Sequence, residues 1–319
     1  MAHLIETMAY VMETPWHGLG IKLQPQQPIE VWQKQAGMDW EIKETEVLYS
    51  VSEGDGLHVK VNPEARVLFR SDTLAPLSVV SNRYKIVQPK EVLEFYRDLV
   101  NASGFELETA GVLKGGRKLW ALAKTGQETV LSGGDKVKAY LLLATSCDGT
   151  LATTAQFTSV RVVCNNTLQL AVGSASADAV KVPHSTQFDP HQVKQNLGLG
   201  LSSWERFVGE MKQLVARPIN KFEAMNYLVD VLGDPLVPLD KQPNQKAIQS
   251  VHSLFSGVGM GADMSSANGT AWGLLNSVTE YVDHSRRART PDSRLDSAWF
   301  GQGAGIKAKA FEKAMLLAA

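Results

Sequence analysis

The sequence contains few cysteines, which limits both its redox chemistry and its metal chemistry. Only Cys147 and Cys164 occur among the 319 residues, and both lie in apolar segments, where a free thiol packs as a small hydrophobic side chain. They do not form a Cys-x-x-Cys pair, and two thiols without histidine partners cannot complete a tetrahedral zinc site. The sequence therefore predicts a reduced, cytoplasmic protein.

Signals for export and for membrane insertion are missing as well. The first residues, MAHLIETMAYVMETPW, have neither a basic start nor a continuous apolar stretch, so no secretion signal is expected. The longest strongly apolar run, from Tyr140 to Ala144, is far shorter than the about 20 residues that cross a bilayer as a helix. A soluble protein without a membrane partner is predicted.

Neither sign of charge is in excess. The chain has 32 Lys and Arg against 33 Asp and Glu, but residues 1–64 are acidic, whereas residues 111–161 and 284–319 are both basic. A nucleic-acid-binding protein needs only a local basic face, so the neutral total does not exclude one. Uneven charge is equally compatible with an ordinary solvated surface.

The recognised motifs of catalysis and cofactor binding are also missing. There is no Gly-x-Ser-x-Gly motif, no Asp-rich cluster for catalytic magnesium and no His-x-x-x-His pair. Gly257-x-Gly259-x-Gly261 fits neither nucleotide-loop consensus, and a turn between helices is favoured over a phosphate site. His17, beside Trp16, is interpreted as a packed turn residue. The sequence predicts no cofactor and no metal, and it leaves enzymatic activity uncertain with a non-enzymatic role favoured.

Hydrophobic periodicity divides the chain into a strand-rich half and a helical half. Alternating segments are joined by turn signals at Lys114-Gly115-Gly116-Arg117 and at Cys147-Asp148-Gly149, and a helix is expected to begin at Pro89. After a polar stretch with two prolines, apolar residues recur at helical spacing. We expect an α+β fold with an antiparallel β-rich domain and its packed helix at 1–174, a linker at 175–189 and a mainly helical domain at 190–319.

Basic residues accompany aromatic ones at several places along the predicted strands and turns, notably around Tyr84, before Trp120 and before Tyr140. If these segments share one sheet, its exposed face could follow a phosphate backbone while the aromatic rings stack on bases. The ordinary solvated face of an antiparallel sheet explains the pattern about as well. The candidate nucleic-acid-binding residues are Arg83, Lys85, Lys114, Arg117, Lys118, Lys136, Lys138 and Arg161.

Several blocks resemble the phage- and plasmid-borne family called domain of unknown function 932. They are PWHGLG at 15–20, SNRYKIVQ at 81–88, SVRVVCNNTL at 159–168, the segment from Trp272-Gly273 to Asp283-His284, and AWFG at 298–301. The resemblance implies a mobile genetic element, in which case the location is the host cytoplasm, but it implies no catalytic residue. The order of elements in residues 90–172 is also similar to the core of Rad52-like single-strand annealing proteins.

The setting and the basic residues together favour a single-stranded DNA-binding protein of the annealing or recombination type, acting as a homo-oligomer. One alternative is an enzyme that processes nucleic acid or nucleotides, with Arg161, Asn165 and Asn166 near its site. Another is an interaction protein of the mobile element that inhibits host defence.

Overall fold

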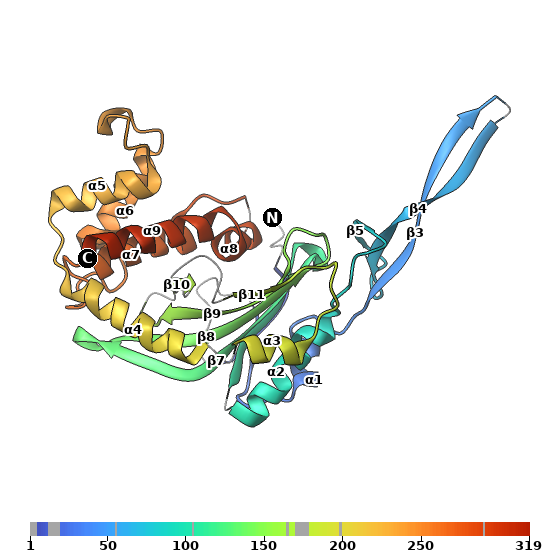
Figure 1. Ribbon diagram of the computed structural model, residues 1–319, viewed down its shortest axis with the longest axis horizontal. Coiled ribbons are helices and arrows are strands. Elements are labelled where there is room, and N and C mark those ends of the chain that lie inside the picture. Colours follow the sequence, from blue (N-terminus) through green and yellow to red (C-terminus); the bar gives the residue numbers. More distant parts are fainter. Residues whose placement is uncertain are drawn as a thin grey trace. The chain divides into compact units, whose positions relative to one another are not determined.

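The structure is a computed structural model that describes residues 5–11, 20–54, 56–103, 105–163, 166–169, 179–197, 200–289 and 291–319. His17, Cys164 and Asn165 lie outside the described residues, so the predictions that concern them stay predictions. The described chain is strand-rich in its first half and helical in its second, which confirms the α+β class (Figure 1).

All the named strands lie before residue 183, with α1 and α2 among them, and the other named helices follow. In order, they are β1 (Ile5–Val11), β2 (Ile21–Leu23), β3 (Ile42–Glu53), β4 (Gly56–Arg70), β5 (Pro76–Ser81), β6 (Glu106–Leu113), β7 (Lys118–Leu131), β8 (Asp135–Ser146), β9 (Thr153–Arg161), β10 (Asn166–Gln169) and β11 (Ala179–Val182). The helices are α1 (Ile29–Gln35), α2 (Pro89–Ser103), α3 (Pro190–Leu197), α4 (Gly200–Ala216), α5 (Lys221–Leu232), α6 (Gln245–Ser253), α7 (Ala271–Glu280), α8 (Pro291–Phe300) and α9 (Gln302–Ala318). No helix of the described chain is long and apolar enough to span a membrane.

The chain forms two compact units, each assembled from separate stretches of sequence. Unit 1 consists of Met1–Thr125, Leu141–Gln156 and Ala179–Leu197, and unit 2 consists of Gly126–Tyr140, Phe157–Asp178 and Gly198–Ala319. Strands β7, β8 and β9 therefore contribute residues to both units. The contiguous domain boundaries expected from the sequence stay a prediction.

The main sheet has the strand order β10-β9-β8-β7-β6-β1-β2, and β11 also pairs with β9. Strands β6 and β7 are antiparallel, and Leu113 lies opposite Lys118 across the short helical turn η1 (Lys114–Gly116). This confirms the predicted glycine-rich connection. Gly116 has a φ of +100°, and a Cβ there would lie 3.0 Å from the Trp40 ring, so both the backbone and the packing favour glycine.

Helix α2 forms much of the apolar core of unit 1. It begins at Pro89, as predicted, and buries Leu93, Phe95 and Tyr96 completely. The Tyr96 hydroxyl donates to the backbone carbonyls of Ala121 at 2.9 Å and Leu141 at 3.1 Å, on strands β7 and β8. These bonds satisfy the buried hydroxyl and fix the helix against the sheet.

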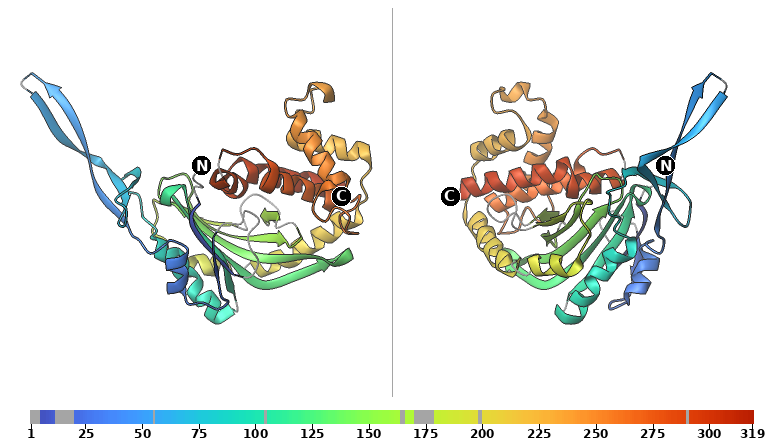
Figure 2. Two further views of the ribbon diagram at one scale, coloured as in Figure 1. Left: turned by 180° about the vertical axis from the view of Figure 1, so that it is seen from behind. Right: turned by 45° about the vertical axis from the view of Figure 1, so that its right-hand side comes forward.

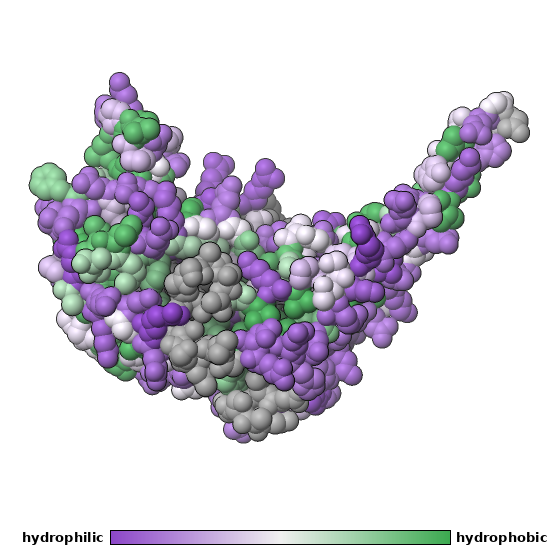
Figure 3. Space-filling model, viewed as in Figure 1, coloured by the Kyte–Doolittle hydropathy of each residue, from purple (hydrophilic) through white to green (hydrophobic). Residues whose placement is uncertain are grey.

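A two-stranded arm extends from unit 1. Strand β5 pairs only with the last part of β4, at Ala65–Phe69. Beyond these residues, β3 and β4 pair only with each other and continue as a two-stranded ribbon (Figure 2). The cross-strand pairs Leu48–Val61, Ser50–Val59 and Ser52–Leu57 share one face of this ribbon, because directly opposed residues lie on the same side. Hydrophobic residues consequently lie among hydrophilic ones along the arm in Figure 3.

Helix α7 forms the centre of unit 2. All ten of its residues are buried, and it packs against α4, α6 and α9 (Figure 1). Its N-terminus is capped by the Thr270 hydroxyl, which accepts a hydrogen bond from the Gly273 backbone N–H at 3.1 Å. A Cβ at Gly273 would lie 1.9 Å from the Ala267 carbonyl oxygen, so the preceding loop can approach the helix only because this residue is glycine.

Candidate functional site

In unit 2, Arg161 belongs to a buried ion pair. Asp135, at the start of β8, is completely buried, and Arg161, at the end of β9, is only 3% exposed. The Arg161 Nε atom lies 2.9 Å from both carboxylate oxygens of Asp135. Asp135 also accepts hydrogen bonds from the Ser266 hydroxyl at 2.7 Å and from the Trp272 indole at 3.0 Å. The two charges are thus paired and well hydrogen-bonded, as buried charges must be.

Arg161 also holds in place the loop that contains Gly257, Gly259 and Gly261, which we call the glycine-rich loop. Its guanidinium donates to the carbonyls of Met260 at 3.3 Å and Gly261 at 3.1 Å. The Met260 backbone N–H in turn donates to the Glu280 carboxylate, whose two oxygens lie 3.1 and 3.2 Å away. An anion site needs N–H groups that point towards the ligand. In this loop, carbonyl groups point at the Arg161 cation, and the Met260 N–H already donates to a carboxylate. These contacts are those of a structural turn and not of an anion site.

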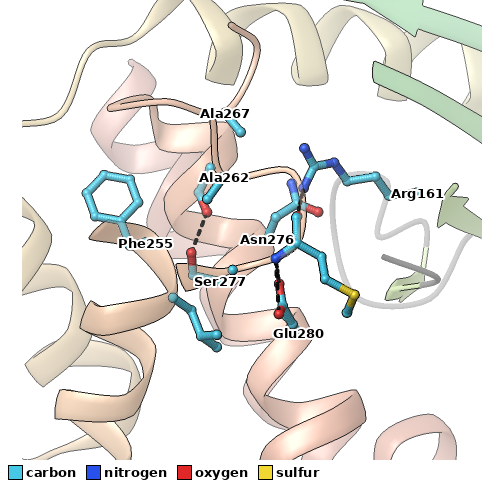
Figure 4. Close-up of a pocket in the computed structure, with 11 residues that line it drawn as sticks. Arg161, Phe255, Ala262, Ala267, Asn276, Ser277 and Glu280 are labelled. Carbon is cyan, nitrogen blue, oxygen red and sulfur yellow. Dashed lines mark hydrogen bonds between the residues drawn. The ribbon is translucent and has the colours of Figure 1, made fainter. Parts of the chain in front are cut away.

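The cavity beside Arg161 is very small (Figure 4). It is lined by residues of β9, the glycine-rich loop and α7, including Phe255, Asn276 and Glu280, and its volume is about 10 Å³. A space of about 10–15 Å³ is the minimum for one water molecule. The cavity therefore has no room for a nucleotide or a base as the loop now lies.

Glu280 is 7% exposed at the end of α7. Desolvation raises the pKa of this carboxyl above its usual value, and the Met260 N–H and the Arg161 charge only partly oppose the shift. Ionised Glu280 is thus a cost to the fold near neutral pH. The role that the contacts show for Glu280 is to hold the loop backbone.

In unit 1, the segment after β5 carries two of the predicted cations. The strand ends at Ser81, and the residues after it bond to a different partner: the Lys85 backbone N–H donates to the His184 carbonyl at 2.5 Å. Arg66 on β4 donates to the Tyr84 carbonyl, also at 2.5 Å. Arg83 and Lys85 are both exposed on this segment.

The Tyr84 ring stacks on the His184 imidazole. The ring centroids are 4.4 Å apart with an interplanar angle of 14°. The Tyr84 hydroxyl donates to the Ser146 carbonyl at 2.7 Å, which anchors the ring to the end of β8. The two His184 ring nitrogens each lie 3.0 Å from a backbone carbonyl oxygen, of Lys85 and of Leu151. The aromatic pair is therefore fixed by segments that are far apart in sequence.

An open pocket of about 480 Å³ lies at this aromatic pair. Arg83, Tyr84 and His184 supply its charged and aromatic lining, and the rest of it is formed by Ser81, Gly149, Ala152, Pro183 and Ser185. Its volume is within the about 300–1,000 Å³ that is usual for small-molecule sites. We call this the Tyr84–His184 pocket.

The glycine-rich turn between β6 and β7 also belongs to this region of unit 1. Cys147 follows Ser146, whose carbonyl holds Tyr84, and its side chain is buried. The Cys147 backbone N–H donates to the Arg117 carbonyl at 2.9 Å, which joins the end of β8 to this turn. Desolvation raises the pKa of the Cys147 thiol to about 12, so it is not a reactive thiolate at neutral pH. Arg117 itself is exposed.

The eight predicted cations thus occupy different environments. In unit 1, Arg83, Lys85 and Arg117 are exposed and Lys114 is half-buried, but Lys118 is 5% exposed and does not project from the turn. The half-buried residues of β8 in unit 2 are Lys136, which pairs with Glu128 at 3.0 Å, and Lys138. Lys118 and Arg161 were predicted on an exposed face but are buried. The neighbouring aromatic residues Trp120 and Tyr140 are buried as well.

The sequence did not point to His184, which falls within the expected linker at 175–189. Its partners Lys85 and Leu151 are 99 and 33 residues away, so no local spacing could reveal the contact. It also missed Asp135 as the partner of Arg161, 26 residues away. In the described part of the chain, no group of three or more His, Cys, Asp or Glu side chains could hold a metal ion.

Comparison with known proteins relates this chain to a family. Residues 76–299, more than half of its length, match the family described as Domain of unknown function (DUF932). The chain is a DUF932 protein. The DUF932 match includes β5, the Tyr84–His184 pocket, the Asp135–Arg161 pair and α7, while the β3–β4 arm precedes it. No curated protein and no solved structure matches the chain.

Proposed function

We propose that this DUF932 protein binds single-stranded DNA, with the Tyr84–His184 pocket as one of the places where a base is held. The supporting observation is an open pocket in which the exposed Arg83 and its neighbour Tyr84 meet His184 from a distant segment, with the Tyr84 ring stacked on the imidazole. Single-strand binders combine cations that follow the backbone with aromatic rings on which bases stack. The residues proposed for contact are Arg83, Tyr84, Lys85 and His184, with Arg117 on the neighbouring turn.

The pocket offers chemistry suited to an unpaired nucleotide. A base in contact with an aromatic ring gains about 1–3 kcal/mol, and this gain tolerates any sequence because every base has a π-face. Arg83 can donate to a phosphate through its planar guanidinium, whereas Lys85 adds a flexible point charge. A duplex offers no free base face for such a pocket, so single strands are the expected form.

The biological role that we propose is single-strand annealing or recombination on a phage or plasmid, with a homo-oligomer as the acting form. It rests on the mobile-element setting that the sequence blocks imply, and on the resemblance of residues 90–172 to annealing proteins. Multiple copies of a pocket that holds one base would cover a strand together. This would compensate for the small contact area of each copy.

The test is the binding of a fluorescent oligothymidine strand to the full chain, compared with the duplex of the same length. We expect single-strand binding that weakens steeply as salt rises, because phosphate contacts release counterions. The Arg83→Ala/Lys85→Ala and Tyr84→Leu variants should each bind at least several-fold more weakly. Tyr84→Phe, which keeps the ring, should retain most of the affinity.

Lys60→Ala provides the matched control, because Lys60 is an exposed lysine of the same unit on the β3–β4 arm. It should bind like the unmodified protein. Absence of binding at low salt, or equal weakening by Lys60→Ala and by Arg83→Ala/Lys85→Ala, would contradict the proposed site.

A further inference from the structure

We propose that the β3–β4 arm is a self-association element, in which one face of its outer ribbon packs against the same face of a second copy of this chain. The ribbon consists of the seven residue pairs from Val47–Asn62 to Glu53–Gly56. The dimer concerns the free protein. Its consequence for DNA affinity rests on the function proposed above.

One face of the ribbon carries no charge. Apart from two serines, its residues are aliphatic, namely Leu48, Leu57, Val59 and Val61. We call this the aliphatic face. These four residues are between 45% and 69% exposed, although leucine and valine are usually buried. The opposite face carries Glu53, His58 and Lys60 around Tyr49 and so suits contact with water.

A ribbon of only two strands is marginally stable in water, and it normally needs a third strand or a packed partner. Strand β5 does not supply the third strand, because it pairs with β4 only at Ala65–Phe69. The exposed fractions show that no described segment covers the aliphatic face. Its cover must therefore come from another molecule.

A second copy suits the aliphatic face better than nucleic acid or a membrane does. Phosphate contacts need cations, but the ribbon has one lysine against one glutamate, and neither lies on this face. Amphipathic elements that bind membranes carry a polar side rich in lysine and arginine, which this ribbon lacks. Against its own copy, an uncharged face meets no like charge and buries no charge without a partner.

The sequence of β3 supports association between identical segments. The stretch VLYSVS at 47–52 combines high β-propensity with no charge, no proline and no glycine. Exposed stretches of this kind associate with their own copies, and they aggregate unless they are covered. A two-fold dimer uses the same tendency but closes after two copies.

The two ribbons should lie antiparallel, because the rest of each chain is then attached at opposite ends and the two copies do not collide. The two-fold axis then crosses the ribbon, and Val59, in the middle of the aliphatic row on β4, lies opposite its own counterpart. The ribbon face measures about 23 Å by 10 Å. That area is well below the about 800 Å² per partner of a standard interface, so we expect a weak, reversible dimer.

The root of the arm is bonded to the segment that follows β5. The Asn82 backbone N–H donates to the Glu64 carbonyl at 3.2 Å, and the Asn82 side chain donates to the Pro63 carbonyl. Arg66 donates to the Tyr84 carbonyl at 2.5 Å. Each arm thus begins beside a Tyr84–His184 pocket, and a dimer presents two pockets that a single long strand can occupy together.

The first experiment is sedimentation velocity of the full chain without DNA, between about 1 and 100 μM, a range that covers weak dimers. The unmodified protein should change from monomer to dimer as its concentration rises. Val59→Lys and Val59→Glu should each remain monomeric, because like charges would face one another across the two-fold axis. Val79→Lys on β5 is the matched control, since Val59 and Val79 are both 62% exposed, and it should still dimerise.

Mixing the two Val59 variants separates a specific two-fold contact from general damage to the arm. An equimolar mixture of Val59→Lys and Val59→Glu should form a mixed dimer, because opposite charges then face one another. A mixture that stays monomeric overturns the antiparallel packing. An unmodified chain that stays monomeric throughout, or Val59 variants that dimerise as well as Val79→Lys, overturns the proposal itself.

The second experiment compares oligothymidine strands of about 12 and 40 nucleotides, since single-strand sites take about 4–16 nucleotides per domain. Leu57→Thr/Val59→Thr removes aliphatic contacts without adding charge. It should bind the short strand like the unmodified protein and the long strand roughly tenfold more weakly, because only the long strand holds two linked pockets. Val79→Thr should match the unmodified protein on both strands.

The two proposals fail in different ways. If the dimer forms and the Val59 variants behave as expected but no strand binds, the arm interface stands and the proposed function is wrong. If both strands bind but the chain never dimerises, the arm proposal is wrong while DNA binding stands. If the chain dimerises and Leu57→Thr/Val59→Thr binds the long strand undiminished, the link between the arm and DNA affinity is wrong.

Discussion

The Asp135→Asn substitution is the sharpest test of how unit 2 is held together. It keeps the shape of the side chain and removes the charge that faces Arg161 from 2.9 Å. Ser266 and Trp272 both donate to the same Asp135 oxygen, Oδ2, so an asparagine can keep these two bonds by placing its amide oxygen there. Its amide nitrogen then takes the place of Oδ1, 2.9 Å from the Arg161 Nε atom. The substitution therefore leaves a buried guanidinium without its counter-ion and sets an amide N–H donor against the Arg161 Nε–H donor.

The expected loss in the free energy of unfolding follows from the contacts that Arg161 keeps. Removing one partner of a buried ion pair typically costs about 3–5 kcal/mol. Arg161 retains the carbonyls of Met260 and Gly261, which partly compensate its charge, so we expect the lower end, about 3 kcal/mol. Ser266→Ala removes one hydrogen bond to a charged acceptor and should cost about 1.5 kcal/mol.

The assay is equilibrium unfolding in urea at pH 7 for Asp135→Asn, Arg161→Met, their double variant and Ser266→Ala. Because Asp135 and Arg161 satisfy one another, the double variant should lose clearly less stability than the sum of the two single losses. A loss below about 1 kcal/mol for Asp135→Asn, or additive losses in the double variant, would refute the view that this pair holds the β8–β9 ends to the glycine-rich loop.

Two further predictions concern helices of unit 2. Gly273→Ala should destabilise the protein by at least about 2 kcal/mol, because its Cβ would overlap the Ala267 carbonyl. Gly209→Ala, at an exposed position of α4, meets no atom within 4 Å and should stabilise the protein by about 0.5–1 kcal/mol; thermal unfolding compares the two variants. Stabilisation of both, or of neither, would contradict the packing described. The raised pKa of Glu280 means that the folded state binds this proton more tightly than the unfolded chain, so its ionisation lowers stability as the pH rises. The stability of Glu280→Gln relative to the unmodified protein should accordingly increase from acidic to neutral pH in urea unfolding, and a pH-independent difference would show that the burial of Glu280 has been misjudged.

The turns and helix starts were predictable because they depend on local chemistry. The glycines of Lys114-Gly115-Gly116-Arg117 meet the positive φ values of the β6–β7 connection, at +69° and +100°. Asp148 and Gly149 lie between β8 and β9, as their turn signal indicated, and Pro89 begins α2. In these places the residue's own backbone preference decides the structure.

The candidate site was predictable only in part, because its contacts are long-range. The SNRYK block drew attention to Arg83 and Tyr84, which line the pocket, but nothing near His184 indicates that it stacks on Tyr84. Arg161 was expected on an exposed face, yet it is buried against Asp135. The apolar residues around it in SVRVVC were the one local signal of burial, and the partner that makes burial possible cannot be read from spacing.

The most direct measurement of the central claim is the salt dependence of oligothymidine binding by the unmodified chain and by Arg83→Ala/Lys85→Ala. Each phosphate contact to a single strand contributes about −0.7 to the slope of log affinity against log salt. Loss of both cations at the Tyr84–His184 pocket should make the slope shallower by about 0.7–1.4, while Lys60→Ala leaves it unchanged. An identical slope in all three proteins, or no binding of the strand at low salt, would contradict the assignment of this pocket to single-stranded DNA.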